Sequence, residues 1–131
     1  MSFTYFIVTP GTEIGSYIQY NDGQRGAFFK FGDTDRPHPT LDIRNGYLSH
    51  NPDIGVGAQL RNARAVSLGT AIKRDLIANG WPVVNGTEWF SVRSQSAWRL
   101  FGVMQQWDGQ TIDDRAYPQL INAILAALNA P

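Results

Sequence analysis

Cysteine is absent from this chain of 131 residues, and its absence removes several classes of chemistry. Without a thiol the protein cannot form a disulfide, use a thiolate nucleophile, or hold zinc or an iron–sulfur cluster through cysteine. No apolar run approaches the roughly 20 residues that a membrane-spanning helix needs. The stretch Met1–Val8 also lacks the basic start of a secretory signal. We therefore expect a soluble protein that is made in the cytoplasm and has no membrane partner.

Charged side chains are also scarce in this sequence. They make up 17% of the residues, and eleven lysines and arginines balance eleven aspartates and glutamates. A balanced chain creates little long-range field, whereas proteins that bind duplex nucleic acid usually present an electropositive face. We therefore expect no nucleic-acid partner. The length suits a single domain, residues 1–131, that buries its own core.

Histidine is nearly as rare, with His38 and His50 as the two examples. No Gly-x-Ser-x-Gly elbow accompanies them, and both lie in a proline-rich segment where a solvated loop histidine is the default. Asp33 and Asp35 stand near His38 and have metal-ligand side chains. The EF-hand spacing fails there, however, and turn chemistry beside prolines explains the same residues. The sequence therefore predicts no catalytic residue, no metal and no cofactor.

The N-terminal part does contain the apolar alternation that is typical of strands. Three segments rich in aromatic and β-branched residues show it: Phe3–Val8, Ser16–Tyr20 and Ala27–Phe31. Residues Asn21–Gln24 join the last two and tolerate the positive φ of a hairpin turn. This pattern predicts an N-terminal antiparallel sheet. A loop over residues 32–57, with a short strand at Leu41–Ile43, is expected to follow.

The spacing of apolar residues then changes to that of a helix. Over Val56–Asn79, the apolar stripe advances by three or four residues through Ala65, Leu68, Ile72 and Leu76. The pair Asn79-Gly80 suits a helix C-terminus. The sequence therefore predicts a central amphipathic helix.

A second hairpin is expected after this helix, because Asn85-Gly86 lies between two β-prone runs. The segment that follows is ambiguous. Ser96–Trp107 has helical spacing of its aromatic and apolar residues, whereas Arg93–Arg99 could also extend the strand. Both alternatives remain open from the sequence alone.

The last predicted helix, Pro118–Asn129, carries no charged side chain. A proline near the first turn suits a helix start, and a single apolar stripe follows it. An exposed helix normally has charged residues on its outer side, so this one is expected to be covered on most sides by its own domain or by another subunit. The predicted fold is α+β, with an N-terminal antiparallel sheet, a central amphipathic helix, an Asn-Gly hairpin and C-terminal helices packed on the sheet.

One run resembles a known family. Gln106–Ile112, followed by Ala116–Leu120 and Ile124, resembles the start of phage tail-collar domains, in which an aromatic-led Asp-Gly-Gln turn precedes a Tyr-Pro-x-Leu helix. The resemblance implies a phage tail protein. The same residues also suit an ordinary helix entry, because Asp-Gly-Gln occurs again at Asp22–Gln24 as turn chemistry.

These features favour a non-enzymatic, phage-type structural or assembly protein, found in the virion, that acts by self-association and by contact with neighbouring virion proteins. A homo-oligomer is expected. The predicted contact set combines the uncharged last helix with two tryptophans: Trp98, Trp107, Leu120, Ile124 and Leu128.

Two other functions remain as alternatives. The first is a module that binds or sequesters a nucleotide-like or sugar ligand, as a phage counter-defence protein does. Its pocket would use aromatic stacking and positive charge: Trp89, Arg93, Trp98 and Arg99. The second is an enzyme that pairs an arginine with Asp33, Asp35 or Glu88, although no spacing selects a reaction.

Overall fold

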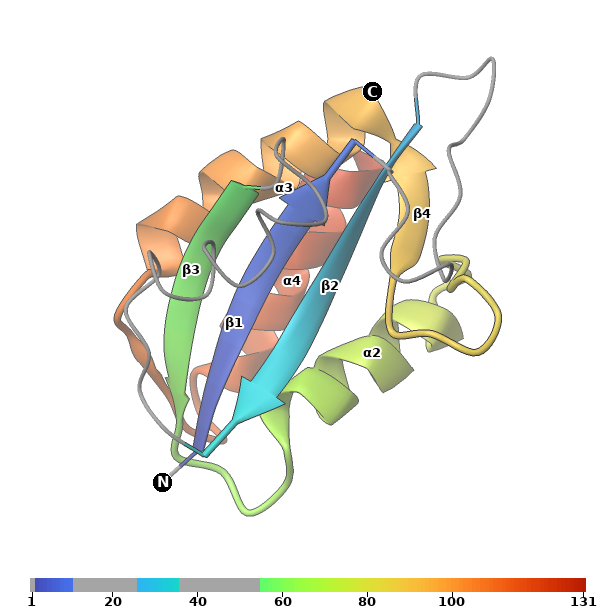
Figure 1. The fold of residues 1–131 in the computed structure, drawn as a ribbon. Helices are drawn as coiled ribbons and strands as arrows, with labels where there is room; N and C mark the ends of the chain where they lie inside the picture. The colour runs from blue at the N-terminus through green and yellow to red at the C-terminus, as the bar shows by residue number, and fades with distance from the viewer. Residues whose placement is uncertain (1, 11–25, 36–54) are drawn as a thin grey trace.

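The computed structural model describes residues 2–10, 26–35 and 55–131 (Figure 1). In chain order the elements are β1 Ser2–Thr9, β2 Gly26–Thr34, β3 Gly55–Asn62, α2 Leu68–Ala78, β4 Phe90–Arg93, α3 Ser94–Trp107, β5 Thr111–Ile112 and α4 Tyr117–Asn129. The fold is α+β, as predicted. The predicted strands Ser16–Tyr20 and Leu41–Ile43 and the turn Asn21–Gln24 lie outside the described residues, as do residues 36–54 of the predicted loop.

The described strands form one sheet in the order β4-β2-β1-β3-β5. β1 lies at its centre and pairs antiparallel with β2 and β3, and only the short β5 pairs in parallel, with β3. The predicted strands Phe3–Val8 and Ala27–Phe31 are confirmed within β1 and β2. β2 runs three residues further than predicted, through Gly32–Thr34, because its pairing with β1 continues to Phe3.

The structure corrects the predicted start of the central helix. Val56–Asn62 belongs to strand β3, and the helix begins at Leu68. The strand was missed because glycines interrupt its alternation. β1 and β3 change register between Phe6 and Ile7, so Gly57 is an extra, bulged residue, and a Cβ on it would lie 2.7 Å from the Phe6 ring. The later part of the prediction is confirmed, since Leu68, Ile72 and Leu76 are buried along α2.

A carboxylate from β2 completes the N-terminus of α2. Asp33 Oδ1 accepts hydrogen bonds from the Thr4 hydroxyl at 2.7 Å and from the Gly69 amide at 3.0 Å. Its Oδ2 accepts from the Ser67 hydroxyl, and Ser67 Oγ in turn accepts from the Thr70 amide at 3.2 Å. Two of the amides that lack partners within the helix are thereby satisfied, and negative charge lies at the helix end that favours it. The contact joins α2 to the sheet.

The Asn-Gly hairpin is present in a short form. Gly86 has φ +77°, the conformation that glycine adopts without strain, and the turn closes with hydrogen bonds from Val84 N to Trp89 O and from Ser91 N to Pro82 O. Only Phe90–Arg93 of its second arm joins the sheet, beside β2. Helix α3 begins at Ser94, directly after this strand, which decides the ambiguous segment in favour of a helix.

The three helices form one core with one face of the sheet. α3 packs on β1, β2 and β3, α2 packs on β2 and β1, and α4 packs chiefly on α3 and also touches α2 (Figure 1). The sheet supplies the phenylalanines of this core: Phe6, Phe29, Phe31 and Phe90. A smaller cluster of Ile7, Phe28 and Trp89 lies apart from it. The helix arrangement therefore leaves α3 and α4 side by side at the surface.

We expect Asp33→Ala to lower the free energy of unfolding by about 1–3 kcal/mol, because it leaves the Gly69 amide and two hydroxyls without their acceptor. Urea denaturation followed by circular dichroism measures this change. Asp35→Ala is the matched control, because Asp35 is exposed and no interaction of its side chain is present among the described residues. Equal effects of the two substitutions would contradict the proposed role of Asp33.

Candidate functional site

The surface formed by α3 and α4 is unusual in its lack of charge. The two helices contain one charged side chain, Arg99, whereas the shorter α2 contains Lys73, Arg74 and Asp75. Each helix has a row of exposed residues with spacings of three, four and three, and Gln106 on α3 and Pro118 on α4 are exposed beside these rows. The exposed stripes are Gln95, Trp98, Gly102 and Gln105 on α3, and Gln119, Asn122, Ala126 and Asn129 on α4. We refer to these eight residues together as the α3–α4 face; Trp98 lies on the side of α3 near Gly55 of β3, and Arg99 lies on the side that meets α4.

Trp98 is the large apolar side chain of this face. It is 40% exposed and packs edge-on against Phe101, with ring centroids 5.3 Å apart. The other members are amides or very small residues. This surface carries no charged side chain and consists of amides, small residues and one partly exposed tryptophan. Such a composition is compatible with burial against another protein surface.

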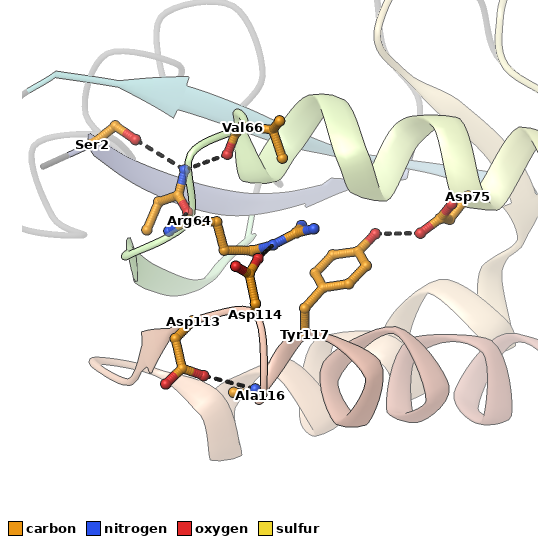
Figure 2. A network of polar contacts seen from close by, with 9 residues as sticks. Ser2, Arg64, Val66, Asp75, Asp113, Asp114, Ala116 and Tyr117 are labelled. Atoms are coloured by element: carbon orange, nitrogen blue, oxygen red, sulfur yellow. Dashed lines mark hydrogen bonds and ion pairs between the residues drawn. The ribbon is translucent and has the colours of Figure 1, made fainter.

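The start of α4 is tied to α2 through Tyr117. Its hydroxyl donates to Asp75 Oδ2 at 2.5 Å, and the Arg64 guanidinium lies 3.9 Å from the centre of its ring. Figure 2 shows the Tyr117 side chain pointing from α4 toward Asp75 on α2. Arg64 Nε also donates to Asp114 Oδ1 at 3.0 Å. Tyr117 therefore joins the start of α4 to α2 and to the β3–α2 connection, which lie 42 residues or more earlier in the sequence.

Arg64 is positioned by Asn62, the last residue of β3, which is 6% exposed. The Asn62 amide donates to Val66 O at 2.8 Å and to Ser2 Oγ at 3.3 Å, and its oxygen accepts from Arg64 N at 2.9 Å (Figure 2). The connection between β3 and α2 is thereby fixed. Arg64 Nη1 is buried and has no hydrogen-bond partner among the described residues. The guanidinium lies over the Tyr117 ring, which provides a cation–π contact.

Burial raises the pKa of the Tyr117 hydroxyl far above its ordinary value, and the hydrogen bond to Asp75 and the negative charge of Asp75 raise it further. Arg64 and Arg74 act in the opposite direction but do not cancel the effect. Tyr117 therefore remains a hydrogen-bond donor to Asp75 over the whole physiological pH range.

The other end of α4 is held by Arg99 of α3. Its guanidinium donates to Ala127 O at 3.1 Å, to Ala130 O at 2.9 Å and to Pro131 O at 3.1 Å. A cation at these carbonyls is favoured because the C-terminal end of a helix carries partial negative charge. The one charge of the two helices is therefore used inside the protein. With both of its ends fixed, α4 presents its exposed stripe in a defined orientation.

The predicted contact set is divided by the structure. Leu120, Ile124 and Leu128 are 0%, 0% and 3% exposed, because α3, α2 and the sheet core cover them. Trp107 is partly buried against the same core, and Trp98 is exposed. In this conformation, a neighbouring subunit could reach Trp98 but not the leucine stripe. The absence of charge correctly indicated a covered helix, but the chain itself covers the apolar stripe.

The predicted ligand set is not assembled into a pocket. Trp89 is buried in the smaller cluster with Ile7 and Phe28, whereas Trp98 packs on Phe101 beside the main core. Arg99 is bound to the carbonyls at the end of α4, and Arg93 is exposed at the end of β4. These four residues were grouped because they combine aromatic stacking with positive charge within one short stretch of the sequence. They separate in space because a strand with alternating faces passes directly into a helix.

The other predicted site residues have structural roles or lie outside the described residues. Both carboxylate oxygens of Asp33 are occupied by the hydrogen bonds at α2, and His38 and His50 are not described. No cluster of three or more potential metal ligands is found within residues 2–10, 26–35 and 55–131. None of the described helices is long and apolar enough to cross a membrane.

The run that resembles a tail-collar motif forms a turn, a short strand and a helix entry. Asp108 Oδ1 accepts from Gln59 N at 2.8 Å, and the Gly109 amide donates to Gln59 O at 2.9 Å. Gly109 has φ +80°. Asp113 Oδ1 accepts from Ala116 N at 2.8 Å and so completes the turn before α4. The run therefore leads the chain from the end of α3 to the start of α4, and its hydrogen bonds attach it to β3.

Comparison of the chain with protein-family models, with curated proteins and with solved structures found no match.

We expect Ile124→Asp to abolish the folded state or remove most of its stability. Removing the side chain alone, as in Ile124→Ala, costs about 2–5 kcal/mol, and a buried carboxylate without a partner adds to this loss. Thermal unfolding measures the change. Asn122→Asp, on the exposed side of the same helix, is the matched control and should shift stability by no more than about 0.5 kcal/mol. A fully stable Ile124→Asp variant would refute the burial described above.

We expect Tyr117→Phe to lower the free energy of unfolding by about 1–3 kcal/mol at neutral pH, because Asp75 loses its donor. The pKa of Tyr117 is higher in the folded protein than in the unfolded chain. Its contribution to stability is therefore fully present at pH values below the ordinary tyrosine pKa of about 10, and it is lost as the pH rises further. The unfolding free energy of the unsubstituted protein should therefore fall more steeply above pH ~10 than that of Tyr117→Phe. Urea denaturation across this pH range measures both slopes, and identical slopes would contradict the argument.

Proposed function

We propose that this protein is a non-enzymatic, phage-type structural or assembly component that associates with copies of itself through the α3–α4 face. The observation that carries the proposal is the absence of charge on this face, together with the exposure of Trp98. Charged side chains are depleted at the centres of protein interfaces because desolvating them is costly.

A second copy of the chain is the partner that this face fits best. In a twofold contact, the same patch lies on both subunits and must be compatible with itself. A patch with net charge would meet the same charge on the other copy and be repelled by it. The α3–α4 face carries no charged side chain, so this repulsion does not arise. Its glutamine and asparagine side chains can both donate and accept, so either copy can satisfy the other.

The anchoring of α4 supports the same proposal. Tyr117 and Arg99 fix the two ends of the helix within the chain, so a partner would not have to order it on binding. A surface that is already ordered loses less conformational entropy on association.

The phage-type part of the proposal rests on the resemblance of residues 106–124 to the start of tail-collar domains. In that setting, neighbouring virion proteins would be further partners, and the self-associated form would be the unit that is assembled.

The experiment is a comparison of two alanine-to-arginine substitutions by native mass spectrometry and by light scattering after size-exclusion chromatography. Ala126 and Ala78 are both exposed helix residues, on α4 and α2 respectively. We expect the unsubstituted protein to form a homo-oligomer, Ala126→Arg to shift it to the monomer, and Ala78→Arg to leave the oligomer unchanged. The arginine at 126 would place like charges in a contact that excludes water.

Two outcomes would overturn the proposal. A monomeric unsubstituted protein would remove self-association as its mode of action. An oligomer that persists in a folded Ala126→Arg variant would place the subunit contact on another surface. Circular dichroism of both variants verifies that any change in mass does not come from unfolding.

A further inference from the structure

A small cleft lies between α2 and the β4 hairpin, away from the α3–α4 face. It has a volume of about 110 Å³ and is lined by Phe31, Gly69, Thr70, Lys73, Glu88 and Phe90. The two phenylalanines are buried, at 6% and 1% exposure, and belong to the main core. In Figure 1, α2 lies beside the hairpin that leads into β4. The cleft therefore combines aromatic side chains of the core with polar side chains from two separate segments.

Glu88 differs from the other acidic residues of the same part of the chain. Within residues 55–131, the remaining carboxylates all accept a hydrogen bond from another residue: Asp75, Asp108, Asp113 and Asp114. Glu88 has no such partner among the described residues, although it is close to the cationic Lys73 at the cleft. A carboxylate that the fold does not use is available to a ligand.

Lys73 of α2 lines the same cleft. Its ammonium approaches Thr87 O at 3.5 Å, which places it beside the hairpin without a strong hydrogen bond. No ion pair within 4.0 Å joins it to Glu88 in the described structure. The Thr70 hydroxyl likewise has no hydrogen bond to the described residues. The cleft thus offers one cation, one anion and one hydroxyl that do not satisfy one another.

From this arrangement we propose that the cleft binds a small zwitterion, namely a free α-amino acid with a side chain of the size of alanine. The carboxylate of the ligand pairs with Lys73, its ammonium pairs with Glu88, and its apolar side chain contacts Phe31 and Phe90. The two opposite charges of the ligand match the two opposite charges of the protein. Each ligand charge then forms a charge-assisted hydrogen bond with its partner on the protein. A cleft of this size suits a small molecule.

This inference does not depend on the proposed self-association, because it uses α2 and the hairpin instead of α3 and α4. It differs from the ligand-binding alternative drawn from the sequence in both its residues and its ligand. That alternative grouped aromatic and basic side chains, whereas the cleft is defined by a lysine and a glutamate fifteen residues apart in sequence, Lys73 and Glu88.

The test is a titration of the full chain, labelled with ¹⁵N, with L-alanine, and in parallel with acetate and with methylammonium at the same ionic strength. We expect L-alanine to shift the amide signals of Gly69, Thr70 and Glu88 saturably, with a Kd in the ~millimolar range that suits so small a ligand. Acetate and methylammonium each provide one of the two charges and should shift these signals at least ~tenfold less effectively.

Three variants complete the test: Lys73→Met, Glu88→Gln and the control Arg74→Met. Lys73 and Glu88 line the cleft, whereas Arg74, the next residue of α2, does not. We expect the first two to weaken L-alanine binding by about tenfold or more and the control to leave it unchanged. The amide spectra of the free variants verify that each remains folded.

The proposal is overturned if L-alanine produces no saturable shifts at the cleft, or if acetate alone reproduces them, which would indicate a site for anions only. It is also overturned if folded Glu88→Gln binds L-alanine as well as the unsubstituted protein does. None of these outcomes changes the oligomeric state that Ala126→Arg tests, so the two proposals can fail separately.

Discussion

The contact of Tyr117 with Asp75 and Arg64 is the interaction on which the helical layer depends. α4 packs chiefly on α3 and shares a buried core with α2, and Tyr117 with the neighbouring ion pair supplies the polar contacts that join it to α2 and to the β3–α2 connection. Burial makes a hydroxyl and a carboxylate expensive to leave unpaired, and the pairing therefore favours a single position of the helix. The exposed, uncharged side of α4 has a fixed orientation because both ends of the helix are held.

The sequence predicted those helices and turns whose characteristic residue pattern lies within one short stretch of the chain. α4 and the later part of α2 follow from apolar residues at helical spacing, and the turn at Asn85-Gly86 follows from glycine at positive φ. β3 was missed because its bulged glycine breaks the alternation on which a strand is recognised. The tertiary hydrogen bonds of Asp33 and Tyr117 join residues that are far apart in the chain, and no spacing in a single sequence indicates them.

The candidate site was harder to predict than the fold, for a related reason. An uncharged helix indicates that something covers it, but the sequence does not say which of its sides is covered by the chain itself. The structure shows that Leu120, Ile124 and Leu128 are covered by the core, while the amide and alanine stripe remains outside. The cleft at Lys73 and Glu88 could not be found from spacing, because a helix and a hairpin bring the two residues together only after folding.

The direct passage from β4 into α3 gives this protein an unusual sensitivity to changes in chain length. Strand pairing with β2 fixes Arg93, and Ser94 already belongs to the helix, so no loop residue absorbs a change between them. Inserting one residue at this junction would turn α3 by about 100° about its axis. Met104 would then take the exposed place of Gln105, and Trp98 would take the half-buried place of Arg99. Homologous chains should therefore vary in length elsewhere and keep this junction unchanged.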